Sequence, residues 1–354
     1  MWFISLSILF ILLSLIPLIQ NTHWFFRFFE FAKIQLFGIL TFITVLGFFL
    51  ITNKSTFFYV VFISNLATLV YQLIALFPFT KWYPTKQTKA KGYSSKTIIL
   101  ISANVYQENK ETDKLIEIIT QQQPDLFLTM ESNQKWENAL AVMEQSYPYH
   151  VKVPQENTYG MHLYSKLEIL SHHVNYFVAD DIPCIEALLK TSDGYVFNFF
   201  GVHPPPPSPT EEKNSKERDG ELLSLAKVIK TKTEPCVVAG DFNNVAWAKS
   251  SILFRKTSEL IDARIGRGLF STFHAKYWFF RFPIDLFFHS PKILIEKLKT
   301  LAYFGSDHFP IYSSFCIAES DNEKNELVET LETENEEEVE EIIEEGKKEK
   351  SENR

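Results

Sequence analysis

The sequence lacks the cysteines that a disulfide scaffold or a thiolate metal site would require. Its 354 residues include only three, at positions 184, 236 and 316, and these lie far apart without the paired spacing of metal ligands. We therefore expect neither a disulfide framework nor a cysteine-bound metal. A chain of this length has room for one domain of about 200–250 residues and additional segments.

The chain also lacks an overall excess of positive charge, and its net charge of −8 comes from one end. Residues 319–354 contain 16 acidic and 5 basic residues, a balance of −11, which leaves +3 on residues 1–318. We expect residues 319–354 to be an acidic tail, disordered or transiently helical, that either keeps the chain soluble or competes with a polyanion for a basic site. The mildly basic remainder suits an anionic substrate without requiring one.

Charged residues are absent from three long apolar runs near the N-terminus, at 1–19, 34–52 and 57–79. Each run reaches the roughly 18–20 residues that cross a bilayer as a helix. A cleaved signal peptide does not fit the first run, which has no basic start and no small-residue cleavage site. A buried soluble bundle is disfavoured because polar stripes are missing. We expect residues 1–80 to form a membrane anchor of three transmembrane helices.

The basic residues around these runs predict the orientation of the anchor. Three crossings place the loop 20–33 and everything after residue 80 on one side, with Arg27, Lys33 and the lysines of residues 81–96, while Lys54 lies on the other side. The positive-inside rule then predicts a multi-pass membrane protein with a cytoplasmic domain. Residues 81–96 are a Lys-rich linker, either a solvated spacer or a segment held near anionic headgroups.

Residues 97–318 alternate between buried strands and amphipathic helices. We expect strands at 97–105, 126–130, 158–165, 185–190, 195–202, 236–239, 283–288 and 311–317. We expect helices at 109–122, 136–143, 216–230 and 252–260. Polar residues follow the ends of several strands, where sites in α/β proteins gather.

The segment Gly240-Asp241-Phe242-Asn243 follows the buried strand that begins at Cys236. Alternation along an extended chain places Asp241 and Asn243 on the same side and turns Phe242 into the core. These two groups together can orient a water molecule and contact an anionic oxygen. An Asx turn that ends the strand is the simpler explanation of the same residues.

Other polar residues stand where they need a partner or a ligand. Asp285, among large apolar residues, requires a hydrogen-bond donor if it is buried. Arg218 lies in the first turn of a helix, where the helix dipole disfavours a cation unless an anion is near. His203 is fixed between a strand and the prolines at 204–207, in either a structural or a functional role. Asp307 and His308 point to opposite sides of an extended backbone, which predicts different roles.

Together these residues resemble the endonuclease/exonuclease/phosphatase superfamily. The similarity covers about residues 97–318, and it extends to bacterial membrane-anchored members in the prolines after His203, in Arg218 and in Pro283-Ile284-Asp285. The resemblance implies an α+β fold, a four-layer α/β/β/α sandwich whose site lies where the strand ends meet. The family's motifs occur in order at Asn104, Glu131, His203, 240–243, 284–285 and 306–308.

The resemblance also implies metal-dependent hydrolysis of phosphate esters. Glu131, with Asn104 and Asp307, would supply oxygen ligands to one Mg²⁺ or Mn²⁺ ion. Asp241 would position or deprotonate the attacking water. Asn243 would bind the pentacovalent phosphorane.

The remaining motif residues would contact the phosphate and the leaving group. His308, oriented by Asp285, would hydrogen-bond the scissile phosphate. His203 would stabilise charge or protonate the leaving oxygen, and Arg218 would clamp a phosphate. Two positions depart from the family: Tyr106 replaces a frequent acid, which puts a second metal in question, and Leu286 replaces a frequent histidine.

The substrate stays open between nucleic acid and a phospholipid or its headgroup. The sequence contains neither a long basic groove nor a run of arginines with interleaved aromatics. Nucleic acid is therefore not positively indicated as the substrate. A catalytically inactive membrane scaffold is the alternative function, and the intact acidic and histidine motifs argue against it. A transporter or channel would need charged residues within the apolar runs. The lipid bilayer is the expected partner, and no segment indicates a protein partner.

Overall fold

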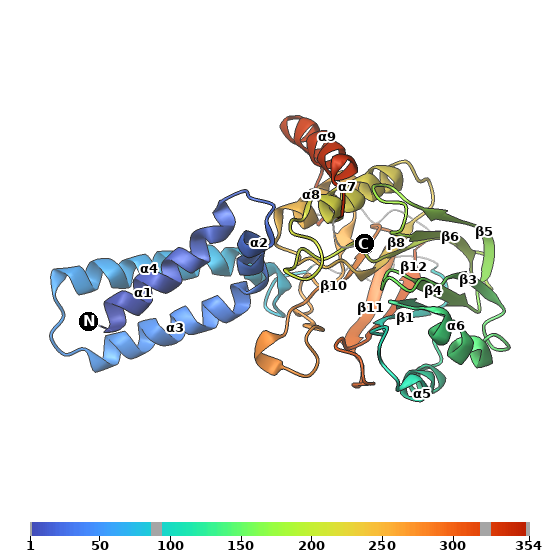
Figure 1. The fold of residues 1–354 in the computed structure, drawn as a ribbon, viewed down its shortest axis with the longest axis horizontal. Helices are drawn as coiled ribbons and strands as arrows, with labels where there is room; N and C mark the ends of the chain where they lie inside the picture. The colour runs from blue at the N-terminus through green and yellow to red at the C-terminus, as the bar shows by residue number, and fades with distance from the viewer. Residues whose placement is uncertain (1, 86–93, 319–326, 352–354) are drawn as a thin grey trace.

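The computed structural model describes residues 2–85, 94–318 and 327–351. Figure 1 shows a bundle of N-terminal helices beside a larger domain of strands and helices, with α2 at the junction. The N-terminal elements are α1 (Trp2–Leu15) with the 3-10 turn Ile16–Leu18, α2 (Trp24–Phe31), α3 (Lys33–Leu50) and α4 (Thr56–Leu76) with the 3-10 turn Phe77–Phe79.

The domain contains two six-stranded sheets. The first sheet has the order β11-β12-β1-β2-β4-β3 and the second the order β5-β6-β7-β8-β10-β9. The strands are β1 (Ile98–Asn104), β2 (Leu126–Met130), β3 (Tyr149–Val153), β4 (Met161–Ser165), β5 (Glu168–Asn175), β6 (Cys184–Lys190), β7 (Val196–Val202), β8 (Cys236–Asp241), β9 (Ile261–Asp262), β10 (Asp285–His289), β11 (Ile293–Thr300) and β12 (Ile311–Ile317).

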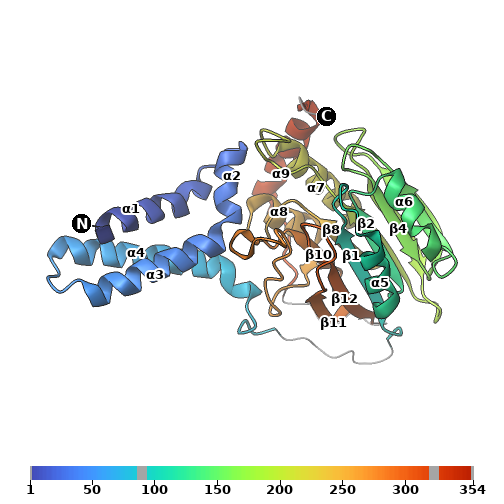
Figure 2. The same cartoon turned by 60° about the horizontal axis from the view of Figure 1, so that its bottom comes forward.

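Helices cover the outer face of each sheet, so the domain has four layers (Figure 2). The first sheet carries α5 (Thr112–Gln122) and α6 (Gln134–Leu140), the latter extended by a 3-10 turn at Ala141–Met143. The second sheet carries α7 (Lys216–Lys230) and α8 (Lys249–Ser258), and a further 3-10 turn at Trp278–Phe280 lies in the loop before β10. These layers agree with the α/β sandwich expected from the sequence.

The main core fills the space between the two sheets. Leu128 and Leu163 of the first sheet, and Phe199, Val237 and Phe287 of the second, belong to one buried apolar cluster. Because strands in a two-sheet core alternate between the inner face and the helical face, both faces of the central strands are apolar. The continuous apolar runs of β1, β2 and β8 follow from this position.

The strand order brings the expected site residues to one edge. β1 runs parallel to β2, and β7 runs parallel to β8. Within each sheet, the residues that follow these two strands therefore lie at the same edge. β10 runs antiparallel to β8, which sets Asp285, its first residue, opposite Asp241, the last residue of β8. β12 runs antiparallel to β1, so residues 306–308, just before β12, return beside Asn104.

The expectation of three transmembrane helices is wrong. In the described part of the chain, two helices are long and apolar enough to cross a membrane, Lys33–Leu50 and Thr56–Phe79. The first apolar run is shorter, because the α-helix ends at Leu15 and Pro17 continues it only as a 3-10 turn. It packs along both α3 and α4.

The C-terminal tail differs from the expected disordered or transient segment. Within the described residues it contains α9 (Thr333–Lys348), which packs on α7. Val339 and Ile343 are buried in the α7–α8 cluster, and Gly346 approaches Gly220 so closely that a Cβ on either would crowd the other. Basic residues of α7 and α8 pair with tail glutamates, including Lys227 with Glu340, Lys249 with Glu338 and Arg255 with Glu329.

Half of the linker expected at 81–96, residues 86–93, lies outside the described residues.

The docking of α9 can be tested by truncating one buried side chain. Ile343→Ala should destabilise the full-length protein by about 2–4 kcal/mol, because it removes a packed side chain from the interface with α7. Thermal unfolding in detergent would measure the change. Glu341→Ala, on the exposed face of the same helix, should change stability by less than about 0.5 kcal/mol. Equal, small effects of both substitutions would mean that α9 does not dock in solution.

Candidate active site

The segment after β8 holds Asp241 in a fixed orientation. Gly240 has φ of 151°, and a Cβ there would lie 2.0 Å from the Val202 carbonyl oxygen of β7, so only glycine fits. Asn243 has φ of 48°, a left-handed conformation that asparagine tolerates. Its backbone N–H donates to Asp241 Oδ1 at 2.8 Å. The segment is therefore an Asx turn, and that turn aims the carboxylate into the site.

Two carboxylates bracket a buried histidine. His308 Nδ1 lies 2.8 Å from Asp285 Oδ2, and its Nε2 lies 3.5 Å from Asp241 Oδ2. Burial favours the neutral imidazole, but Asp285 and Asp241 outweigh it and raise the pKa of His308 above its ordinary value. Burial raises the pKa of Asp241, an effect that the His308 charge opposes and the Asp285 charge reinforces. His308 thus presents an imidazolium edge toward the cavity at neutral pH.

Glu131 stands beside this group at the end of β2. The side-chain nitrogen of Asn104 donates to Glu131 Oε1 at 2.8 Å and to Asp241 Oδ2 at 3.1 Å, so one amide orients both carboxylates. The Gln107 backbone N–H donates to Glu131 Oε2 at 3.2 Å. Burial raises the pKa of Glu131 to about 7, and the Asn104 hydrogen bond opposes that rise.

Asn104 is placed differently from the oxygen ligand that we expected. Its Oδ1 accepts the backbone N–H of Tyr106 at 3.0 Å, and its nitrogen faces the carboxylates. In this orientation Asn104 positions Glu131 and Asp241. Asp307, half-buried, lines the same cavity as Glu131.

The donor set fits a hard divalent cation. Carboxylate oxygens are the ligands that Mg²⁺ and Mn²⁺ prefer, and Glu131 and Asp307 offer them. Atoms of Asp241, Asp285 and His308 also lie within 4.8 Å of one another. The raised pKa of His308 keeps its imidazole protonated at neutral pH, however, so His308 would have to lose a proton before this second group could bind a cation. Glu131 is the better candidate.

His203 lies on the other side of Asp241. Its Nε2 is 3.9 Å from Asp241 Oδ2, and its ring lies against Tyr159 with 5.5 Å between centroids. Burial, aided by the charge of His308, lowers the pKa of His203 to about 3, so this imidazole is neutral. Its buried Nδ1 has no hydrogen-bond partner within the described residues. A neutral ring can still donate one N–H to a substrate oxygen.

Arg218 does not reach the cavity, in contrast to the expected phosphate clamp. Its guanidinium is buried and donates to Asp219 Oδ1 at 2.8 and 2.9 Å and to the Asn243 carbonyl oxygen at 2.9 Å. The carboxylate of Asp219 forms an ion pair with Arg218, which explains why an arginine can stand in the first turn of this helix. The Asn243 side chain donates to the Pro204 carbonyl at 3.0 Å. Arg218 therefore supports the backbone of the Asp241–Asn243 turn.

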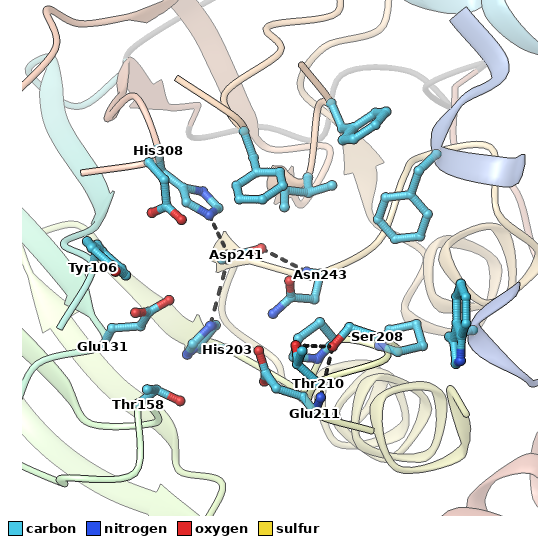
Figure 3. Close-up of a pocket in the computed structure, with 18 of the residues that line it drawn as sticks. Tyr106, Glu131, Thr158, His203, Ser208, Thr210, Glu211, Asp241, Asn243 and His308 are labelled. Carbon is cyan, nitrogen blue, oxygen red and sulfur yellow. Dashed lines mark hydrogen bonds and ion pairs between the residues drawn. The ribbon is translucent and has the colours of Figure 1, made fainter. Parts of the chain in front are cut away.

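These groups line a cavity of about 620 Å³. Figure 3 shows Glu131, His203, Asp241 and His308 converging on it, with Tyr106 beside Glu131. Part of its wall was not among the site residues expected from the sequence: Thr158, the loop 206–211, the domain residues Phe273, Phe282 and Ile284, and three aromatic residues of α2, namely Trp24, Phe28 and Phe31. Two of these α2 residues stand four positions apart, at 24 and 28, which was a usable signal for a helix with one aromatic face.

Acidic residues and histidines gather where the strands of this four-layer sandwich end. This arrangement is the one expected for the family that the sequence resembles, and comparisons with known proteins support it. Residues 101–308, more than half of the chain, match the Endonuclease/Exonuclease/phosphatase family. The chain belongs to this family. No curated protein matches the chain.

Solved structures share the fold. A humanized TDP2 from D. rerio is 17% identical, with a TM-score of 0.54 over 62% of this chain and 99% of that chain. A family protein from Bacteroides thetaiotaomicron is 19% identical, with a TM-score of 0.52 over 66% and 99%. The human nocturnin catalytic domain with bound sulfate is 15% identical, with a TM-score of 0.52 over 66% and 100%.

The raised pKa of Glu131 predicts how metal and pH affect stability. Because that pKa is higher in the folded state, the metal-free fold loses stability as pH rises from about 4 through about 7, where Glu131 ionises without a cation. A bound cation removes this penalty, so Mg²⁺ or Mn²⁺ should raise the Tm more at pH 8 than at pH 5. Thermal scans of the full-length protein in detergent, with metal and with EDTA, measure this difference.

Glu131→Gln should abolish the metal-induced rise in Tm, whereas Glu168→Gln, on the exposed face of β5, should preserve it. A rise that is equal at both pH values, or that survives Glu131→Gln, would place the cation elsewhere.

Proposed function

We propose that this protein is a membrane-anchored hydrolase of phosphate esters that uses a divalent metal. The observation that carries the proposal is the Asp285–His308–Asp241 chain of contacts beside Glu131, at one end of a single cavity. Members of this family are phosphoester hydrolases, and the matched residues 101–308 include all four of these side chains.

Asp241 is the proposed base for the attacking water. Its Oδ1 is held by the Asn243 N–H and its Oδ2 lies 3.1 Å from the Asn104 nitrogen, so the carboxylate cannot rotate away from the cavity. As the oxygen of water bonds to phosphorus, Asp241 takes its proton and the ester P–O bond breaks. Asn243, at the same turn, is the proposed contact for the crowded phosphorane.

The histidines divide the remaining work by their charge. His308, protonated and fixed by Asp285, would bind a non-bridging phosphate oxygen and stabilise the charge that develops there. His203, neutral and buried, would donate a hydrogen bond from its N–H to the departing ester oxygen and so stabilise the charge that develops on it. A divalent cation held by Glu131 and Asp307 would polarise the phosphoryl group.

The anchor is proposed to sit in a bilayer through α3 and α4. Both helices expose large apolar side chains, including Phe49 at 75% and Ile74 at 70%, which a water-soluble bundle would bury. Two crossings leave α2, Arg27 and Lys33 on the same side as the domain. The positive-inside rule then still favours a cytoplasmic domain.

Substitution of the proposed base and the proposed phosphate contact tests the mechanism. Asp241→Asn and His308→Ala should each lower kcat/KM at least about 100-fold in the hydrolysis of bis-p-nitrophenyl phosphate by the full-length protein. EDTA should abolish the same activity. His172→Ala, on an exposed strand far from the cavity, should keep it. Activity that survives EDTA or Asp241→Asn would refute these roles, and inactivity of the wild type on every phosphate ester would favour a binding scaffold.

A further inference from the structure

One wall of the catalytic cavity belongs to the membrane anchor. Trp24, Phe28 and Phe31 of α2 line the cavity together with Phe282 and Ile284 of the domain. In Figure 3 the blue ribbon of the N-terminal segment lies across the pocket from Glu131 and Tyr106. The cavity therefore has a polar end, where the acids and histidines converge, and an aromatic end formed by the anchor.

This aromatic wall is held in place by specific contacts. Trp247 follows the Asp241–Asn243 turn in the chain, and its Nε1–H donates to the Glu30 carbonyl oxygen at 2.7 Å. The backbone N–H of Trp24 donates to the backbone carbonyl oxygen of Lys213 at 3.0 Å. The rings of Phe31 and Phe282 meet edge to face with 6.1 Å between centroids. The wall is thus a built part of the site.

The charge of the cavity disfavours a polyanionic substrate. The described residues that line it include no lysine or arginine. They include four acidic residues, Glu131, Glu211, Asp241 and Asp307. Binding of nucleic acid depends on basic side chains along the backbone path, even where aromatic residues stack on the bases. A substrate with one phosphate and an apolar body matches the two ends of the cavity better.

The apolar surface continues from the cavity toward the spanning helices. The loop 276–281 exposes four consecutive aromatic residues, and Trp278 is 79% exposed. Gln35, in the first turn of α3, ties this loop down by donating to the carbonyl oxygens of Phe279 and Arg281 at 3.0 and 3.3 Å. Between them lies a groove of about 460 Å³ lined by Ile34, Phe42 and Trp278, among others. Exposed aromatic residues at the start of a spanning helix are typical of the bilayer interface.

We propose that the site acts on an amphipathic phosphate ester drawn from the bilayer, with the phosphate at the Asp241–His308 end and the acyl or alkyl chain along the aromatic wall of α2. This inference rests on the proposed hydrolase function and specifies its substrate class. Loop 276–281 enters the bilayer interface and brings the mouth of the cavity to the lipid surface.

The test compares two esters that differ only in chain length. Full-length protein in phosphatidylcholine nanodiscs with Mg²⁺ is given p-nitrophenyl methyl phosphate or p-nitrophenyl dodecyl phosphate, and p-nitrophenolate release is measured. Partitioning into the bilayer favours the dodecyl ester in every variant, so the informative quantity is the ratio of the two kcat/KM values. Phe28→Ala should lower this dodecyl-to-methyl ratio about 10-fold, since the ring contacts the chain.

Phe25→Ala is the matched control. Phe25 lies on the same helix with nearly the same exposure, 45% against 42% for Phe28, but does not line the cavity. It should leave the ratio unchanged. Equal effects of the two substitutions, or faster cleavage of a single-stranded oligonucleotide than of the dodecyl ester, would overturn the lipid substrate while the hydrolase function stands. Failure to cleave either ester would overturn the hydrolase function itself.

The position of the loop has a separate readout. In vesicles of phosphatidylcholine brominated near the headgroup end of its acyl chains, Trp278 should be quenched, so Trp278→Phe should remove a measurable share of the quenching. Trp136→Phe, which changes a tryptophan buried in the domain, should remove none. Quenching that is identical in the wild type and Trp278→Phe would place the loop outside the bilayer and overturn entry of substrate from the lipid.

Discussion

The pairing of β8 with β10 fixes the geometry on which the site depends. The antiparallel register sets Asp241 opposite Asp285, at the end of one strand and the start of the other. A slip of one residue would turn one of these carboxylates to the opposite face of the sheet. His308 arrives from the first sheet and contacts both, so the packing of the two sheets and the ladder within the second are joined at this point. Strand register thus positions the acidic and histidine side chains, and the surrounding loops and α2 form the rest of the cavity wall.

The electrostatics of this edge differ from those elsewhere in the domain. Two buried acids away from the site have an arginine partner: Asp219 pairs with Arg218 at 2.8 Å and Asp262 with Arg264 at 2.6 Å. Glu131, by contrast, receives hydrogen bonds only from the neutral Asn104 side chain and the Gln107 backbone among the described residues. Because an ionised carboxylate buried without a cation is unfavourable, this arrangement leaves a charge that an external cation can neutralise.

The sequence predicted the central strands, and which residues meet at one edge of the sheets, better than it predicted the edge strands and the long-range contacts. The apolar runs at 126–130 and 311–317 and the helix at 216–230 have the predicted bounds, since burial on both faces leaves a clear pattern. β3, β5, β9 and β11 were missed, because edge strands such as Glu168–Asn175 are largely exposed and are defined by their neighbours. Arg218 was misplaced because the pattern revealed its unusual position but not its partner Asp219. The docking of α9 was missed because its three buried positions, one of them a glycine, are few among many glutamates.

The contact between anchor and domain shows why the two are best regarded as one folding unit. Leu76 and Phe79 of the anchor share a buried cluster with Trp247, Ile265 and Ile284 of the domain. Cutting the chain near residue 97 would expose this apolar surface next to the catalytic turn, and it would remove the aromatic wall from the cavity. The polar end, which depends on the strand ladder, would keep its residues. Under the proposed function, an isolated domain would therefore retain hydrolysis of small esters and lose the proposed contact with the apolar part of a substrate.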